Sequence, residues 1–247
     1  MLKKIILGLF VLVVVVLAAT YFVRNMLVKK AVVAGGTYAL GVETNLGSAS
    51  LEIGGGSVSL NDYVVNNPPG FASDKFLSIR RGVFDVDAGS VLDDEVKVDS
   101  FVLEGLTLNL EQIDRKGNFQ MLLDNIKRIN LSSSKESQKF RIGLIALRDI
   151  QVAGSLNILG RKAEKSFKLD NFTLRDVGSD NGAKISEITS TIVKTLISKA
   201  LAQGGGLLPD GFGQNLGELK DQGIEKVKTE AADKLKDLGK SLTGDKK

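Results

Sequence analysis

Alternation of apolar and polar residues between Val42 and Val177 is the feature that most limits what this chain can fold into. In stretches such as "ASLEI" and "LTLNLE" an apolar side chain takes every second position. This period marks β-strands with one apolar and one solvated face. The turn-forming clusters between the strands are short, which favours antiparallel neighbours. We therefore predict a mainly β fold with helices, built on an antiparallel sheet.

The apolar positions of these strands share one face, which is the candidate lining of an apolar groove. They are Ala49, Leu51, Ile53, Val58, Leu60, Phe84, Val86, Leu106, Leu108, Leu110, Ile150, Val152 and Leu156. Leu103 and Leu106 break the alternation, so Gly105 is predicted to lie at a bulge that bends the sheet. The residues alone leave two arrangements open: an open groove that takes apolar molecules, or a closed sandwich filled by the same side chains.

A paired proline separates two of the predicted strands. The stretch "NNPPGF" includes the candidate strand-ending corner, Asn67, Pro68, Pro69, Gly70 and Phe71. Two prolines remove two backbone donors, which a central strand does not tolerate. Gly70 permits a free turn, and Phe71 is placed to fold back as an apolar plug. The corner predicts a strand end and carries no function by itself.

The N-terminus predicts a membrane anchor. An apolar run extends from Ile5 to Val23 without a charge, close to the roughly 20 residues that a spanning helix needs. A cleaved signal peptide is the alternative, but its apolar region is about 7–15 residues long. A buried helix of a soluble protein is a second alternative, which the length of the uncharged run disfavours. We expect an uncleaved single-pass anchor in the inner membrane, with Lys3 and Lys4 cytoplasmic and the bulk of the chain periplasmic.

Helical periodicity appears in four further places. A short helix should follow the anchor and end before Gly41, and "GNFQMLLDNIKRI" places Phe119, Leu122, Leu123 and Ile126 on one helical face. The expected organisation is a tail and anchor, a juxtamembrane helix, a β domain, a capping helix, and a glycine-rich hinge with a charged amphipathic tail helix: residues 1–24, 25–41, 42–180, 181–203 and 204–247. The tail helix is either solvated, bound to a membrane surface, or laid over the groove.

Composition narrows the chemistry. The 247 residues include no His and no Cys, and the net charge is +4. There is therefore no thiolate, disulfide or zinc–thiolate site, and no side chain with an ordinary pKa near neutrality. Charge is spread evenly and aromatic residues are few, so nucleic acid is not an expected partner. Asp85 and Asp87 lie on a polar strand face, where acids are ordinary. We predict no catalytic residue, no metal and no cofactor.

The order of the segments resembles the N-terminal module of the AsmA-like proteins. That family shows an Asn-Pro-x-Gly-Phe corner, here Asn67 to Phe71, and a Gly-x-x-Asn turn before a short helix, here near Gly117-Asn118. The resemblance covers about Met1 to Ile129, and family members are usually several times longer. It implies a sheet curled into an open half-pipe, or taco, with an apolar concave face. Such proteins are implicated in phospholipid transport between membranes and in outer-membrane biogenesis.

The expected function follows from this resemblance and the apolar face. We expect an anchored periplasmic protein, not an enzyme, that binds phospholipid acyl chains in an apolar β groove and assists lipid movement or outer-membrane homeostasis. The expected partners are phospholipid and the inner membrane, with other envelope proteins as further candidates. A non-enzymatic anchored scaffold of the cell envelope is the alternative. A carboxylate-dependent hydrolase of envelope polymers is a third hypothesis, with no residue that favours it.

Overall fold

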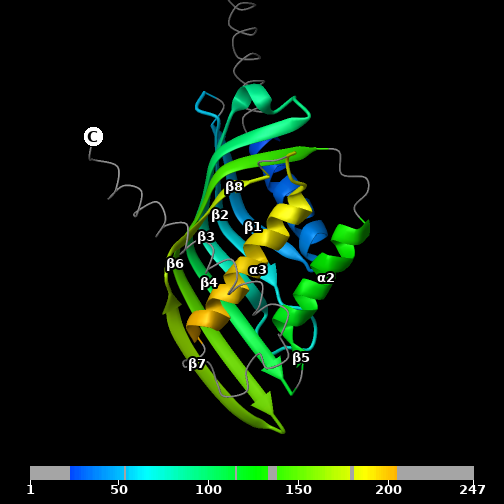
Figure 1. Cartoon of the computed structure of the whole chain (residues 1–247), viewed down its shortest axis with the longest axis vertical. Coiled ribbons are helices and arrows are strands. Elements are labelled where there is room, and N and C mark those ends of the chain that lie inside the picture. Colours follow the sequence, from blue (N-terminus) through cyan, green and yellow to red (C-terminus); the bar gives the residue numbers. More distant parts are fainter. Residues whose placement is uncertain (1–22, 53, 115, 133–137, 179–180, 205–247) are drawn as a thin grey trace, which may run out of the picture.

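The computed structural model describes residues 23–204, except for 53, 115, 133–137 and 179–180. Residues 23–40 form a helix, and an eight-stranded sheet with two further α-helices follows (Figure 1). The elements in chain order are β1 (Thr44–Glu52), β2 (Ser57–Asn66), β3 (Lys75–Val86), η1 (Ala88–Ser90), β4 (Glu95–Ile113), β5 (Lys116–Gly117), α2 (Asn118–Ser132), β6 (Lys139–Ile158), β7 (Arg161–Leu169), β8 (Phe172–Val177) and α3 (Ile185–Gly204).

The sheet is mixed, which corrects the prediction of an antiparallel sheet. Its order is β1-β2-β3-β4-β6-β7, with β5 beside β4 and β8 beside the first part of β6. Strands β4 and β6 run parallel along nearly their whole length, from Glu95 beside Lys139 to Ile113 beside Asn157. Parallel neighbours need a crossover, and the segment containing β5 and α2 supplies it. The predicted helix is therefore part of the connection that carries the chain back, so that β6 runs in the same direction as β4.

One row of residues crosses the sheet without pairing. At this row, each of five neighbouring strands contains a residue that its partners skip: Gly47, Asp62, Arg80, Gly105 and Asp149. We call this set the interruption row. Asp62, Gly105 and Asp149 have φ of 55°, 68° and 52°. The predicted irregularity at Gly105 is present, but every neighbouring strand shares it. The pairing register is therefore kept across the row, while in each of these strands the alternation of side chains switches faces at this point.

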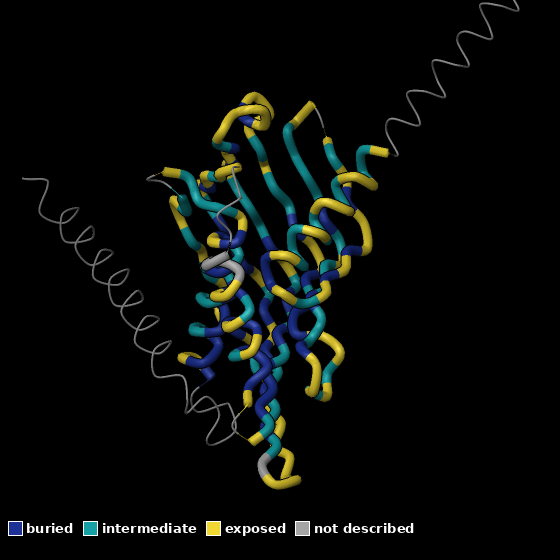
Figure 2. Tube along the Cα trace, turned by 90° about the vertical axis from the view of Figure 1, so that its right-hand side faces the viewer, coloured by how far each residue is buried: buried dark blue, intermediate teal, exposed yellow. Residues whose placement is uncertain are grey.

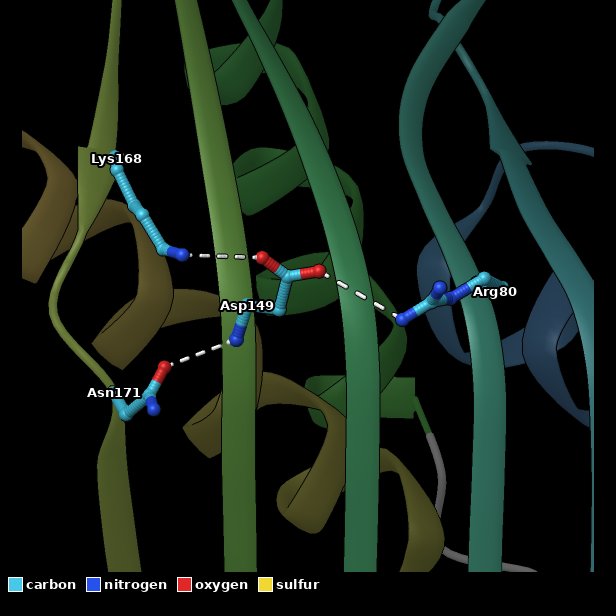
Figure 3. Close-up of polar contacts among 4 residues, drawn as sticks. All are labelled: Arg80, Asp149, Lys168 and Asn171. Carbon is cyan, nitrogen blue, oxygen red and sulfur yellow. Dashed lines mark hydrogen bonds and ion pairs between the residues drawn. The ribbon is translucent and has the colours of Figure 1, made fainter.

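The outer face of the interruption row carries ion pairs (Figure 3). Asp149 lies 3.7 Å from Arg80 on β3 and 3.3 Å from Lys168 on β7. Its backbone N–H donates to Asn171 Oδ1 at 2.9 Å, at the point where the neighbour of β6 changes from β8 to β7. The Asn171 side chain therefore replaces a missing ladder partner between two short strands.

The main core lies between the sheet and helices α2 and α3. Phe119, Leu122 and Ile126 of α2 are fully buried, and α3 adds Leu196 and Ile197. Figure 2 shows buried residues gathered in the middle and lower part of the molecule, with half-buried strands above. The closed sandwich is therefore wrong: one sheet, which does not close on itself, has part of its apolar face covered by helices.

Helix 23–40 protects the free edge of β1. Asn25 Oδ1 accepts the N–H of Leu51 at 3.2 Å, and Lys29 Nζ donates to the carbonyl of Gly47 at 2.9 Å. Further along, Thr37 Oγ1 accepts the N–H of Thr44. An uncovered edge strand would offer these backbone groups to another chain, so the helix acts as a lateral cover. The helix ends at residue 40, which agrees with the predicted end before Gly41.

Several predictions fall outside the described residues. They are the anchor over residues 5–22, the groove position Ile53, and the tail helix within 205–247. Among the helices that are described, none combines the length and apolarity needed to cross a membrane.

Candidate functional site

An apolar pocket of about 470 Å³ opens between helix 23–40, the sheet and the first half of α3. Its lining comes from all three layers: Ala31, Val32, Gly35, Gly36, Leu40, Leu60, Tyr63, Val65, Leu77, Ile79, Gly82, Phe84, Phe101, Leu103, Phe140, Ile185, Ile188, Thr189, Ile192 and Val193. None of these residues is charged, and Tyr63 and Thr189 supply its only side-chain hydroxyls. The pocket is the best candidate for a binding site.

Cross-strand rows form the floor of the pocket. One row runs through Ala49, Leu60, Gly82, Leu103 and Leu147, which are successive partners on five strands. Gly82 leaves a gap in this row. A Cβ there would meet Leu103 Cδ2 at 3.3 Å and Leu60 Cβ at 3.8 Å. The missing side chain therefore gives the floor part of its depth.

The adjacent row closes the upper part of the floor with aromatic rings. Phe84 and Phe101 are cross-strand partners, and their rings stack with centroids 3.8 Å apart. Both are only partly buried, although they pack against the core. Stacked rings are rigid and present a broad apolar surface, which suits contact with a flexible apolar ligand.

Helix 23–40 forms one wall and approaches the sheet through two glycines. At Gly36 a Cβ would overlap the Tyr63 hydroxyl, so the helix can contact β2 only because this side chain is missing. At Gly35 nothing lies within 4 Å of a Cβ position, because that position opens into free space. Burial raises the pKa of the Tyr63 phenol, and its hydrogen bond with Thr44 opposes this effect.

The predicted lining residues divide into three groups. Leu60 and Phe84 line the pocket. Leu51, Val58 and Val86 are half-buried near the same end of the sheet. The remaining described positions are buried, mostly beneath the helices: Ala49, Leu106, Leu108, Leu110, Ile150, Val152 and Leu156. Leu108, Leu110 and Ile150 are 0% exposed, so they are core residues and no ligand reaches them.

Sequence reasoning missed most of the pocket because of the interruption row. Val58 and Leu60 alternate in one phase, whereas Tyr63 and Val65 on the same strand follow the opposite phase. Asp62 between them, with φ of 55°, brings Leu60, Tyr63 and Val65 to the one face that lines the pocket. Leu77 and Ile79 relate to Phe84 in the same way through Arg80. Two glycines inside helix 23–40 were the other available signal, since they mark close approach or free space.

The proline corner is held by a buried polar network away from the pocket. Glu111 is 3% exposed and accepts hydrogen bonds from Asn67 Nδ2 and from the backbone N–H groups of Ala72 and Ser73, at 2.8–3.0 Å. Asn118, fully buried at the start of α2, donates to Asn67 Oδ1 at 2.9 Å. Pro68 is buried, whereas Pro69 and Gly70 are exposed and Phe71 is half-buried, so Phe71 is not a core plug.

The acids considered for catalysis have structural partners. Asp85 accepts a hydrogen bond from Ser100 Oγ at 2.6 Å, and Asp87 caps η1 by accepting the N–H of Gly89. Within the described part of the chain, acidic side chains form no group of three that could hold a metal ion. Comparison of the sequence with protein-family models and with curated proteins gives no match. The likeness to the AsmA-like family therefore stays a prediction from the sequence.

Proposed function

We propose that this protein is anchored in the inner membrane, binds a phospholipid acyl chain in the apolar pocket, and assists lipid movement in the periplasm or outer-membrane homeostasis. The observation that carries the proposal is the half-open cavity of about 470 Å³ without a charged lining residue. Ligand pockets commonly measure about 300–1,000 Å³ and are mostly apolar. Each acyl methylene buried there contributes about 0.8 kcal/mol.

The lining indicates which part of a phospholipid would enter. A phosphate or carboxylate inside would lose its hydration without a cationic partner, which is costly. The pocket offers two hydroxyls, and that of Tyr63 is already engaged with Thr44. The acyl chain therefore enters, and the charged headgroup stays at the mouth. The lining therefore favours a lipid, whose charged headgroup is well separated from the end of its acyl chain, over a small polar substrate.

The pocket also lies close to the proposed membrane anchor along the chain. The uncharged run ends at Val23, and the same helix contributes Gly35 to the pocket wall. Twelve residues of α-helix rise roughly 18 Å, and the headgroup region on each side of a bilayer is about 5–8 Å thick. A lipid drawn partly out of the bilayer would have a short path to the pocket.

Photocrosslinking tests the proposal on the full chain reconstituted in phospholipid vesicles. The probe is phosphatidylcholine with a photoreactive group near the end of one acyl chain. We expect adducts on pocket residues such as Leu60, Leu103 and Ile192, identified by mass spectrometry of peptides. An absence of adducts from all pocket peptides, alongside labelling of the anchor, would contradict lipid binding and favour the anchored scaffold.

A matched pair of variants at one position supplies the control. Gly35→Leu projects a side chain into the free space of the pocket, whereas Gly35→Ala adds only one methyl group. Neither meets an atom within 4 Å of its Cβ, so both should fold. We expect Gly35→Leu to lose most pocket adducts and Gly35→Ala to keep them. Equal labelling of both variants would mean that the probe does not occupy this cavity.

A further inference from the structure

Exposed apolar side chains gather at one end of the sheet. Leu92 is 97% exposed and Val91 49% exposed, on the turn that follows η1 between β3 and β4. Val23, Met26 and Leu27 in the first turns of helix 23–40 are about half exposed. Figure 1 shows η1 and its turn projecting beyond the ends of β3 and β4. Exposed apolar clusters of this kind mark sites of contact with proteins or membranes.

Hydrogen bonds fix the start of helix 23–40 at this same end. Asn25 Oδ1 accepts the N–H of Leu51, which is the penultimate residue of β1. Leu51 pairs with Val58, and Val58 with Phe84 near the end of β3. The N–H of Asp87 then bonds to the carbonyl of Lys97, which holds the η1 turn against the start of β4. The two exposed groups therefore belong to one end of a continuous hydrogen-bonded structure.

The chain itself indicates what would cover this end. The uncharged run from Ile5 ends at Val23, only two residues before the Asn25 side chain that holds β1. If that run crosses a bilayer, the end of the sheet that carries Leu92 must lie near the bilayer surface. Asp93 and Asp94 follow Leu92 directly, so attraction to anionic lipid does not account for the contact. Apolar insertion between headgroups does.

We propose that Val91 and Leu92 insert into the interfacial layer of the membrane that holds the anchor. The η1 turn is then a second attachment point, which limits the tilt of the sheet and sets the direction in which the pocket faces. This inference rests on the membrane anchor of the proposed function and is independent of the ligand in the pocket.

The composition of the chain makes a clean test possible. It has no Trp, so Leu92→Trp introduces a single reporter. The matched control is Leu159→Trp, because Leu159 is 92% exposed in the turn between β6 and β7. It follows the end of β6, which runs parallel to β4, so the two turns lie at opposite ends of a 19-residue strand. At about 3.3 Å per residue that strand spans roughly 60 Å.

Both full-length variants are reconstituted in phosphatidylcholine vesicles, with and without bromine on the acyl chains. We expect bromine to quench most of the Leu92→Trp emission and to leave the Leu159→Trp emission unchanged. Absence of quenching at position 92, or equal quenching at both positions, overturns the proposal.

Vesicle flotation separates this failure from failure of the anchor. A chain that floats with the vesicles but shows no quenching at position 92 keeps its anchor and loses only the second attachment. A chain that does not float loses both. Because the chain has no Cys, Leu92→Cys with a polarity-sensitive dye repeats the measurement if the Trp variant does not fold.

Discussion

Arg80 and Asp149 come from strands that are not neighbours, yet their side chains meet at 3.7 Å across β4 (Figure 3). The Arg80 side chain passes over Gly105, where a Cβ would stand 2.7 Å from its Nε atom and 2.9 Å from its Cβ. Gly105 also has φ of 68°. The contact across three strands therefore depends on the absence of a side chain in the middle one.

Gly105→Ala should consequently destabilise the sheet. A left-handed backbone costs a residue with a Cβ about 1–2 kcal/mol, and the overlap with Arg80 adds to this cost. For a chain of this size, that corresponds to a fall in Tm of roughly 2–8 °C. Thermal unfolding of the detergent-solubilised chain, followed by circular dichroism, measures it.

The matched change is Asp149→Asn, which removes both ion pairs and keeps a residue that tolerates positive φ. Because the paired side chains are 65% and 48% exposed for Arg80 and Asp149, solvent screens the pairs and their loss should cost below about 1 kcal/mol. A larger effect of Asp149→Asn than of Gly105→Ala would mean that charge, and not backbone geometry, holds this part of the sheet.

Adjacent glycines in helix 23–40 should respond oppositely to alanine. Gly35→Ala meets nothing within 4 Å, so it should stabilise the helix by about 0.5–1 kcal/mol. Gly36→Ala gains the same helical preference but overlaps the Tyr63 hydroxyl, and overpacking typically costs about 1–3 kcal/mol. Chemical denaturation of both variants measures the difference.

A double-mutant cycle with Tyr63→Phe identifies the atom responsible. Removing the hydroxyl should relieve much of the cost of Gly36→Ala, so the two changes should be strongly non-additive. Additive effects would show that the helix contacts β2 through some other group. The single variant Tyr63→Phe also reports the value of the hydrogen bond with Thr44.

The sequence is sufficient to predict local structure, but not to predict strand pairing or the face of the sheet on which each side chain lies. Helix α2 was predicted with its buried face, because Phe119, Leu122, Leu123 and Ile126 are close in sequence and their spacing is unambiguous. The parallel pairing of β4 with β6 was not predicted, since it depends on where α2 returns the chain. The interruption row was seen at Gly105 alone, because an Asp or Arg carries no sign that its neighbours skip it.

The same limit applies to the candidate site. Leu108 and Leu60 have the same apolar alternation, but Leu108 lies in the core beneath the helices and Leu60 lines the pocket. Which half of the sheet the helices cover is a matter of tertiary packing, so alternation cannot separate the two. Leu108→Asp would consequently report on folding and not on lipid binding, because it buries a charge in the core.

Glu111→Gln should loosen the proline corner without changing the pocket. Both carboxylate oxygens of Glu111 accept hydrogen bonds, so a Gln amide nitrogen would face a donor at one of them. An unsatisfied buried donor costs about 1–3 kcal/mol. Hydrogen exchange should accelerate at the amides of Ala72 and Ser73. Unchanged exchange at these two amides would mean that the prolines alone hold the corner.

Tyr63 should give the pocket wall a stability that falls at high pH. Burial raises its pKa above the ordinary value of about 10, whereas the unfolded chain keeps that ordinary value. Below pH 10 both states are protonated and the full stability is present. Above pH 10 the unfolded chain releases a proton that the folded chain retains, so stability falls until the pH passes the folded pKa. The difference between the tyrosinate absorbance titrations of the parent chain and of Tyr63→Phe should show a Tyr63 step displaced above pH 10, and Tyr63→Phe should also remove its share of the pH dependence of stability. A Tyr63 step at the ordinary pKa of about 10 would mean that water reaches the Tyr63 hydroxyl and that the wall of the pocket opens there.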